Sequence, residues 1–143
     1  MWHWEARHPD WTGPDDLAIK IRELREITDW EKPIYVKLGA TRVAHDVKLA
    51  VHAGADVVVV DSMQGGTAAT QVTFIEHVGI PTLAAVRQAA DALEELNMTG
   101  KVQLILSGGI RSGADAAKAL ALGANAVSIG QGVLFSLGCN SDT

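Results

Sequence analysis

The chain has 143 residues, 48% of them hydrophobic, which is sufficient for one domain with a sizeable core. Its formal net charge is -5 and it has no basic run, which argues against nucleic acid and anionic membranes as partners. The single cysteine, Cys139, excludes an intramolecular disulfide, and no apolar run suits a signal sequence or a membrane span, so we expect a cytoplasmic protein.

The N-terminal residues 1–13 show neither a helical nor a strand pattern. We expect an irregular segment whose tryptophans pack against the first helix or a partner chain, and an active-site role for His8 stays open. Apolar residues then recur at helical spacing over residues 17–27, which predicts an amphipathic helix. A short β-rich run at residues 34–38 predicts the first strand, and residues 43–53 predict the second helix.

The second expected strand is a run of four valines at residues 57–60. The run is continuous instead of alternating, which is typical of a strand covered on both faces in a parallel sheet. Beyond an irregular connection, we expect a helix over residues 83–96 and a third strand over residues 102–106. The alanine-rich residues 112–122 predict a further helix, and residues 126–129 predict a fourth strand.

Strands that alternate with helices in this way predict right-handed crossovers and a parallel sheet. The α/β pattern corresponds to the C-terminal (β/α)4 half of a TIM (β/α)8 barrel, because a complete barrel needs about 250 residues. We treat residues 1–143 as a single domain and expect one of three arrangements. These are a homodimer that closes an eight-stranded barrel, an open flavodoxin-like sheet, or a swapped, larger homo-oligomer.

Two glycine-rich turns directly follow the last two expected strands and lead into helical segments, the second starting near Val133. Glycine lets the backbone approach an anion and aim its N–H groups at it, and a helix start adds a positive dipole. Either turn alone could be an ordinary connection, but a barrel's phosphate site is frequently built from the loops after strands seven and eight. We therefore predict a phosphate site made of Ser107, Gly108, Gly109, Gly130, Gln131 and Gly132.

From about residue 8 to its end, the sequence resembles the FMN-binding domain of glutamate synthase and its glutamate-synthase-like relatives. Three stretches carry the resemblance, at residues 54–68, 106–113 and 124–139. The loop at residues 65–67 is the most diagnostic part. Inosine-monophosphate dehydrogenases share the serine-glycine-glycine-isoleucine turn and the alanine-rich helix but resemble this loop less.

The resemblance implies a (β/α)8 barrel whose FMN transfers electrons to reduce the imine of 2-oxoglutarate and ammonia, with the two turns holding the FMN phosphate. It implies that Lys37 lies beside the pyrimidine end of the flavin ring, where a cation stabilises the charge of the reduced flavin. The alternative for Lys37 is an ordinary surface lysine. Gly65, Gly66 and Thr67 are implied to contact the flavin ring or a 2-oxo-acid carboxylate, so Lys37 and Thr67 are the catalytic candidates. Asp61 is interpreted as a turn cap.

Glutamate synthases of the large type carry several cysteines after the last barrel strand, which bind an iron–sulfur cluster. Cys139 stands alone here, so we expect no metal site from these residues. Two other interpretations stay open: a non-catalytic phosphate-binding or assembly half-barrel module, and a nucleotide oxidoreductase like inosine-monophosphate dehydrogenase. The latter is weaker, because those enzymes use a cysteine nucleophile in the loop that corresponds to residues 65–67, and none stands there.

Overall fold

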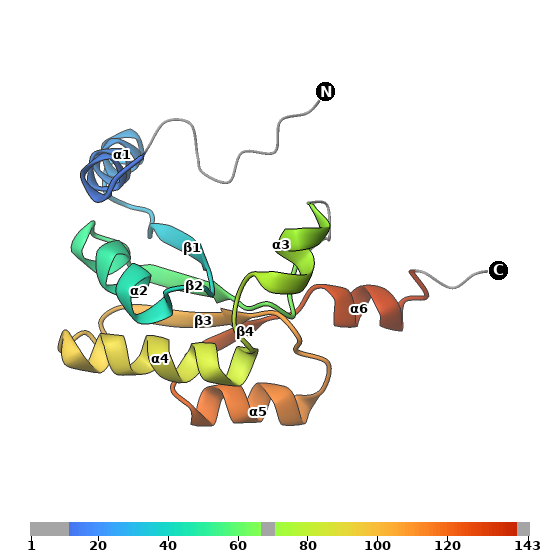
Figure 1. Cartoon of the computed structure of the whole chain (residues 1–143). Helices are drawn as coiled ribbons and strands as arrows, with labels where there is room; N and C mark the ends of the chain where they lie inside the picture. Colours follow the sequence, from blue (N-terminus) through green and yellow to red (C-terminus); the bar gives the residue numbers. More distant parts are fainter. Residues whose placement is uncertain (1–11, 67–70, 140–143) are drawn as a thin grey trace.

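The sheet is the organising feature of the structure, a computed structural model that describes residues 12–66 and 71–139. Four parallel strands lie in the order β1-β2-β3-β4, and each pairs only with its sequence neighbours (Figure 1). The strands are β1 (Tyr35–Gly39), β2 (Val57–Asp61), β3 (Gln103–Ser107) and β4 (Ala126–Ser128). The helices are α1 (Pro14–Ile27), α2 (Val43–His52), α3 (Val72–His77), α4 (Thr82–Glu95), α5 (Gly113–Ala121) and α6 (Gln131–Ser136).

This strand order confirms the predicted parallel α/β architecture and its half-barrel character. In a flavodoxin-like sheet the order reverses at a switch point, which places helices on both faces. Here the order is sequential and the sheet is open, with β1 and β4 at its two edges. Successive strands of a (β/α)8 barrel have this sequential order, and their helices cover one face.

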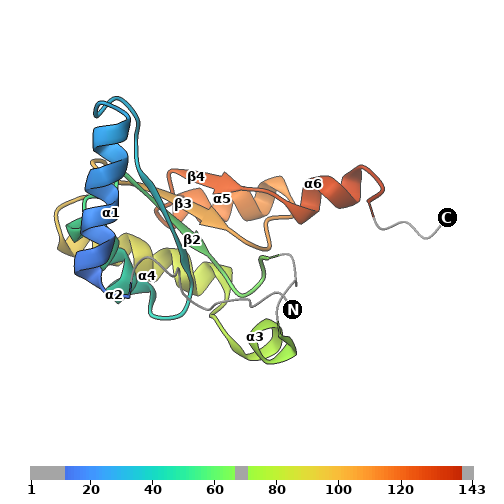
Figure 2. The same cartoon turned by 90° about the horizontal axis from the view of Figure 1, so that it is seen from above.

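The two faces of the sheet differ in what covers them. Helices α2, α4 and α5 lie along one face, and α1 lies beside α2 (Figures 1 and 2). Because side chains alternate along a strand, every second residue points into that helical layer. The core is built there from Val58, Val60, Leu104 and Leu106, each at most 1% exposed. The opposite face, which would be the interior of a closed barrel, carries Tyr35 with 58% of its surface exposed.

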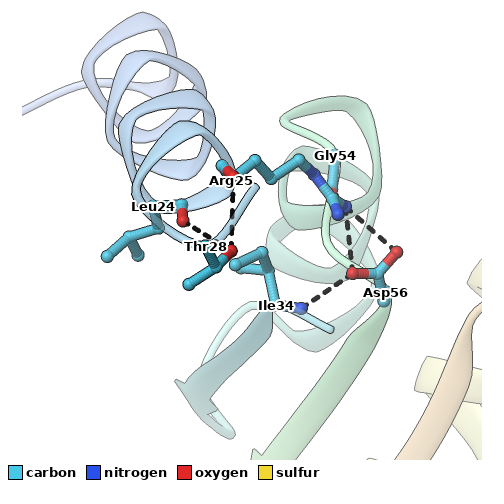
Figure 3. A network of polar contacts seen from close by, with 6 residues as sticks. All are labelled: Leu24, Arg25, Thr28, Ile34, Gly54 and Asp56. Carbon is cyan, nitrogen blue, oxygen red and sulfur yellow. Dashed lines mark hydrogen bonds and ion pairs between the residues drawn. The ribbon is translucent and has the colours of Figure 1, made fainter. Parts of the chain in front are cut away.

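An arginine–carboxylate contact fixes α1 against the amino end of the sheet (Figure 3). Arg25 Nη2 donates to both carboxylate oxygens of Asp56 at 3.0 Å and to the carbonyl of Gly54 at 2.6 Å. The N–H of Ile34 also donates to Asp56, at 2.7 Å, and the Arg25 guanidinium lies 5.3 Å from the centre of the Trp30 ring. The side chain of Asp56 thus joins the loop before β2 to α1 and to the residue before β1.

The largest difference from the sequence-based expectation is α3, which lies within the connection expected to be irregular. Its residues Val72, Thr73, Phe74 and Ile75 are β-branched or aromatic and have modest helix propensity, so the sequence pattern did not indicate a helix. All six of its residues are exposed.

The last helix, α6, begins earlier than expected, at Gln131 instead of near Val133. The N–H groups of Val133 and Leu134 already bond the carbonyl of Gly130, which therefore starts the first turn. Within the described residues, no helix is both long enough and apolar enough to span a bilayer. Most of the predicted irregular segment at residues 1–13 lies outside the described residues.

Candidate functional site

The candidate site lies at the carboxyl ends of the strands, where parallel α/β sheets and barrels bind their ligands. The loop after β2 and the turn after β3 meet here, since the N–H of Ser62 donates to the carbonyl of Ser107 at 3.0 Å. Asp61 and Ser107 are register partners, and Ser128 is the next partner on β4. The predicted residues Ser107, Gly65 and Gly66 therefore come from neighbouring segments at one end of the sheet.

Glycine is required in two of the predicted positions by the close approach of these loops. A Cβ atom on Gly65 would lie 2.4 Å from Asp61 Oδ1 and 2.9 Å from the Cα of Gly108. A Cβ on Gly108 would lie 2.4 Å from Ser62 Oγ, and the φ of Gly108 is +101°, which disfavours other residues. The sequence pattern suggested an anion as the reason for these glycines, and the structure adds direct packing of one loop on the other.

A buried hydroxyl, Thr82 Oγ1, joins the loop after β2 to the turn after β3. It lies 2.6 Å from Gln64 Oε1, 2.9 Å from the carbonyl of Gly108 and 2.6 Å from Ser62 Oγ. The N–H of Thr82 also donates to Gln64 Oε1, at 2.9 Å, which identifies that atom as the amide oxygen. Thr82 thus binds both the loop after β2 and the turn after β3.

The donors in this network follow from counting protons. Gln64 Oε1 and the carbonyl of Gly108 can only accept, so both compete for the single proton of the Thr82 hydroxyl. The contact between Ser62 and Thr82 therefore has Ser62 as its donor. Sequence reasoning missed Thr82, because its partners are 18 to 26 residues away and only the folded chain brings them to the start of α4.

The turn after β4 joins the same surface. Gln131 Nε2 donates to the carbonyl of Gly66 at 3.2 Å. Gly132 lies against the previous turn, because a Cβ built on it would stand 3.0 Å from the carbonyl oxygen of Ile110. Gly109, with a φ of +71°, packs its Cα side against Gln64. The structure therefore brings both predicted phosphate turns and the described part of the diagnostic loop into one contiguous surface.

The start of α5 uses some of its own N–H groups. The carboxylate of Asp115 accepts from the N–H of Arg111 at 3.1 Å and from the N–H of Ser112 at 3.0 Å. These bonds hold the pKa of Asp115 below its ordinary value, and the bond from the Arg111 N–H has the largest effect. The N–H groups of Arg111 and Ser112 are thus used by the helix cap.

Lys37 lies on the sheet face away from the helices and is 62% exposed. Its Nζ is 2.8 Å from Oδ2 of Asp61, the last residue of β2, so the ammonium is directed toward the carboxyl end of the sheet. This places Lys37 at the same end as the glycine turns. Thr67, the other catalytic candidate, lies outside the described residues.

The interpretation of Asp61 as a turn cap is wrong. Its carboxylate pairs with Lys37, while its Oδ1 is buried and has no hydrogen-bond partner among the described residues. The loop is capped instead by Ser62, whose Oγ accepts from the N–H of Gln64 at 3.4 Å and whose carbonyl accepts from the N–H of Gly65 at 3.0 Å. The physical reason is that Asp61 is still part of β2 and shares the open face with Lys37.

Comparison with known proteins gives a consistent result. The family model described as the conserved region in glutamate synthase matches residues 5–142. The chain is 71% identical over 135 residues to a glutamate synthase large subunit-like protein of Rhizobium meliloti. It is 42% identical over 135 residues to an archaeal glutamate synthase (NADPH) of Methanocaldococcus jannaschii. Both matches cover 94% of this chain but only 30% and 26% of those proteins, so the chain spans less than a third of their length.

Solved structures with the same arrangement include flavoenzymes. A mutant flavocytochrome b2 with pyruvate bound superposes with a TM-score of 0.67 at 27% sequence identity, covering 93% of this chain and 29% of that one. Another mutant of flavocytochrome b2, with benzoylformate, gives a TM-score of 0.65 at 28% identity and covers 86% of this chain and 28% of that one. The half-barrel is therefore similar to part of a larger fold in each case.

Proposed function

Because the chain belongs to the glutamate synthase family, whose conserved region matches residues 5–142, we propose that it is the FMN-binding half of a glutamate-synthase-type oxidoreductase. The reaction of such an enzyme would be reduction of the imine formed from 2-oxoglutarate and ammonia. The observation that carries this proposal is the contiguous surface of three loops at the carboxyl end of the sheet, with the ammonium of Lys37 at the same end.

The residues of this surface fit a phosphate-bearing flavin. The turns at residues 107–110 and 129–132 contain no acidic side chain that would repel a phosphate. Gly108 and Gly109 both have positive φ and carry no Cβ, as close approach of the backbone to an anion requires. Gly130 and Gln131 begin the neighbouring turn. We assign the phosphate to these two turns.

Lys37 has a separate role in this proposal. When bound, the flavin would supply the two-electron chemistry that no side chain of this chain offers. Lys37 would stabilise the negative charge that accumulates on reduction, because its ammonium lies on the open face of the sheet. The loop that contains Gly65 and Gly66 would orient the ring or the carboxylate of the 2-oxo acid, together with Thr67.

A second half-barrel is needed to complete such a site. The open sheet leaves β1 and β4 as unpaired edges, and an uncovered sheet face is a liability in water. We propose that a second (β/α)4 half covers this face, supplied by another copy of the chain in a homodimer or larger homo-oligomer, or by a further part of a longer polypeptide. Mass measurement in solution tests the first of these, since a strictly monomeric chain would contradict self-association.

The incomplete barrel also favours a second candidate, a phosphate-binding or assembly module without redox chemistry. Titration of the purified chain with FMN, followed by flavin fluorescence, separates the two. Saturable quenching is expected for the first function, and inorganic phosphate should compete with it. Phosphate binding without any effect of FMN would support the module instead. Reoxidation of reduced FMN that depends on both ammonia and 2-oxoglutarate would exclude the module.

The variant Gly108→Ala tests the phosphate site in this titration, and Gly113→Ala is its matched control. The methyl group added in Gly108→Ala would meet Ser62 Oγ and requires an unfavourable φ, so it should weaken FMN binding. Gly113→Ala, at the first position of α5 with nothing within 4 Å of its added Cβ, should bind FMN as the original chain does. Equal binding by both variants would contradict the assignment of the phosphate to the turn after β3.

A further inference from the structure

We infer that Asp61 is a positioning residue for Lys37, and that its carboxylate holds the lysine ammonium at the place where a bound flavin needs a cation. The inference rests on the proposed function for its use of the flavin, but the ion pair itself is a property of this chain. Lys37 Nζ and Asp61 Oδ2 are 2.8 Å apart, and they come from different strands.

The register of the sheet explains the direction in which Asp61 draws the lysine. Lys37 is the register partner of Val59, whereas Asp61 is the partner of Gly39, two residues further along β1. Residues two apart on a strand share a face, so Lys37 and Asp61 both lie on the face away from the helices. The ion pair therefore runs diagonally and draws the ammonium toward the carboxyl end of the sheet.

The two partners differ in how firmly they are held. Lys37 is 62% exposed, and a lysine that extends into solvent samples many rotamers unless something fixes its end. Asp61 is 19% exposed and is packed beneath Gly65, whose Cα lies so close that an added Cβ would stand 2.4 Å from Oδ1. The flexible side chain of Lys37 is thus paired with a carboxylate, that of Asp61, which is itself held in place by the loop that contains Gly65.

The second carboxylate oxygen is the observation that favours a functional role. Asp61 Oδ1 is the one buried side-chain polar atom in the described residues that has no hydrogen-bond partner. Buried polar atoms are almost always paired, because leaving one unpaired destabilises the fold. The carboxylate of Asp61 thus has one oxygen without a hydrogen-bond partner, while its other oxygen supplies the negative charge that pairs with the Lys37 ammonium.

Asp61 has two possible effects on a bound flavin, and they oppose each other. As a positioning residue it strengthens the effect of Lys37, because a fixed cation stabilises the reduced flavin better than a mobile one. As a bare negative charge it weakens that effect, because it partly cancels the charge of the ammonium. The effect of Lys37→Met, measured once in the original chain and once in the Asp61→Asn variant, distinguishes these roles.

The first test needs no flavin. Acetylation of lysine amines with a limiting reagent, followed by peptide mass spectrometry, gives a labelling rate for each lysine of the folded chain. In Asp61→Asn, which preserves shape and removes charge, Lys37 should react several-fold faster, while the exposed Lys101 keeps its original rate. An unchanged rate at Lys37 would show that the carboxylate does not hold the amine.

Nuclear magnetic resonance of the lysine ammonium groups in the unsubstituted chain covers the case in which Asp61→Asn does not fold. Lys37 should show slower ammonium proton exchange and less motion than Lys101. Equal mobility of the two groups would overturn the inference without any variant.

The second test uses the FMN-loaded chain and measures the midpoint potential of the flavin. Lys37→Met should lower this potential in the original background, and its effect should be much smaller when Asp61→Asn is already present. An equal or larger effect in that background would overturn the positioning role, because Asp61 would then act only as a nearby charge. Failure of the unsubstituted chain to bind FMN would contradict FMN binding by this half-barrel alone, while the labelling test would still judge the ion pair.

Discussion

Gly65 and Gly108 lie so close together that a Cβ atom on Gly65 would stand 2.9 Å from the Cα of Gly108. The contact joins the loop after β2 to the turn after β3, two segments that sequence alone treats as separate motifs. The same lack of a side chain that would let each backbone approach a bound flavin, at its phosphate for Gly108 and at its ring for Gly65, also lets the two loops approach each other. Stability and ligand binding should therefore change together at these positions.

We predict that Gly65→Ala destabilises the fold by about 1–3 kcal/mol, the usual cost of forcing a group into a packed site. The added methyl group would meet Asp61 Oδ1 and the backbone of Gly108, and neither can move freely. Urea denaturation measures the loss, and FMN titration should show weaker binding by the same variant. Gly113→Ala serves as the control, because its Cβ would have nothing within 4 Å. Equal stability of the two variants would refute the argument.

We predict that Thr82→Val costs about 1–3 kcal/mol, because it removes a buried hydroxyl while keeping the shape of the side chain. Ser62 and the carbonyl of Gly108 would each lose a partner. Chemical denaturation of Thr82→Val and Thr82→Ser tests this, since the serine variant keeps the hydroxyl and should retain more stability. Thr41→Val, at an exposed threonine near the same end of the sheet, should change stability little. A loss in Thr41→Val as large as that in Thr82→Val would contradict the prediction.

The contact between Arg25 and Asp56 predicts a pH dependence of stability. Burial by itself would raise the pKa of Asp56, but the hydrogen bonds from Arg25 and from the N–H of Ile34, with the charge of Arg25, outweigh it and lower the pKa. A carboxyl group with a lowered pKa stabilises the fold above its unfolded pKa of about 3.9, and that contribution is lost as the pH falls through its folded value.

The difference in unfolding free energy between the original chain and Asp56→Asn should therefore be largest near neutral pH and should shrink under acid. Urea titrations at a series of pH values measure it. Arg25→Met should show a similar trend, because it removes the partner that lowers the pKa. A difference that stays constant down to strongly acidic pH would show that Asp56 does not act through its charge.

We predict that Gln131→Glu lowers the affinity for FMN by tenfold or more, which corresponds to about 1.4 kcal/mol. The side chain of Gln131 donates to the carbonyl of Gly66 beside the proposed phosphate turns. A carboxylate in its place would repel both that carbonyl oxygen and the FMN phosphate. Stability should change by no more than about 0.5 kcal/mol, because the residue is exposed. Fluorescence titration measures the affinity.

Gln103→Glu is the matched control for this prediction. It makes the same chemical change at an exposed glutamine, but Gln103 is the first residue of β3 and so lies at the amino end of the sheet. Its affinity for FMN should equal that of the original chain. A similar loss in both variants would mean that net charge, not the position of Gln131, controls binding.

Much of the fold was predictable because local patterns and tertiary structure agree. The four valines of residues 57–60 form β2, and the alanine-rich segment that follows Ser112 forms α5, with Ser112 as its capping residue. Prediction failed at α3, where exposed β-branched and aromatic residues gave no helical signal. It also failed for Asp61, because its ion pair depends on the register between β1 and β2.

The sequence by itself determined the alternation of strands and helices, the family and the two glycine turns, because these depend on residue types at short spacings. Only the tertiary structure decided that the strands follow each other in sequential order and that the loops after β2, β3 and β4 form one surface. It alone revealed Thr82 beneath the loops and Asp61 beside Lys37. The physical reason is that a hydroxyl and a carboxylate acquire their roles from partners that are distant in the chain, and folding alone brings those partners within hydrogen-bonding distance.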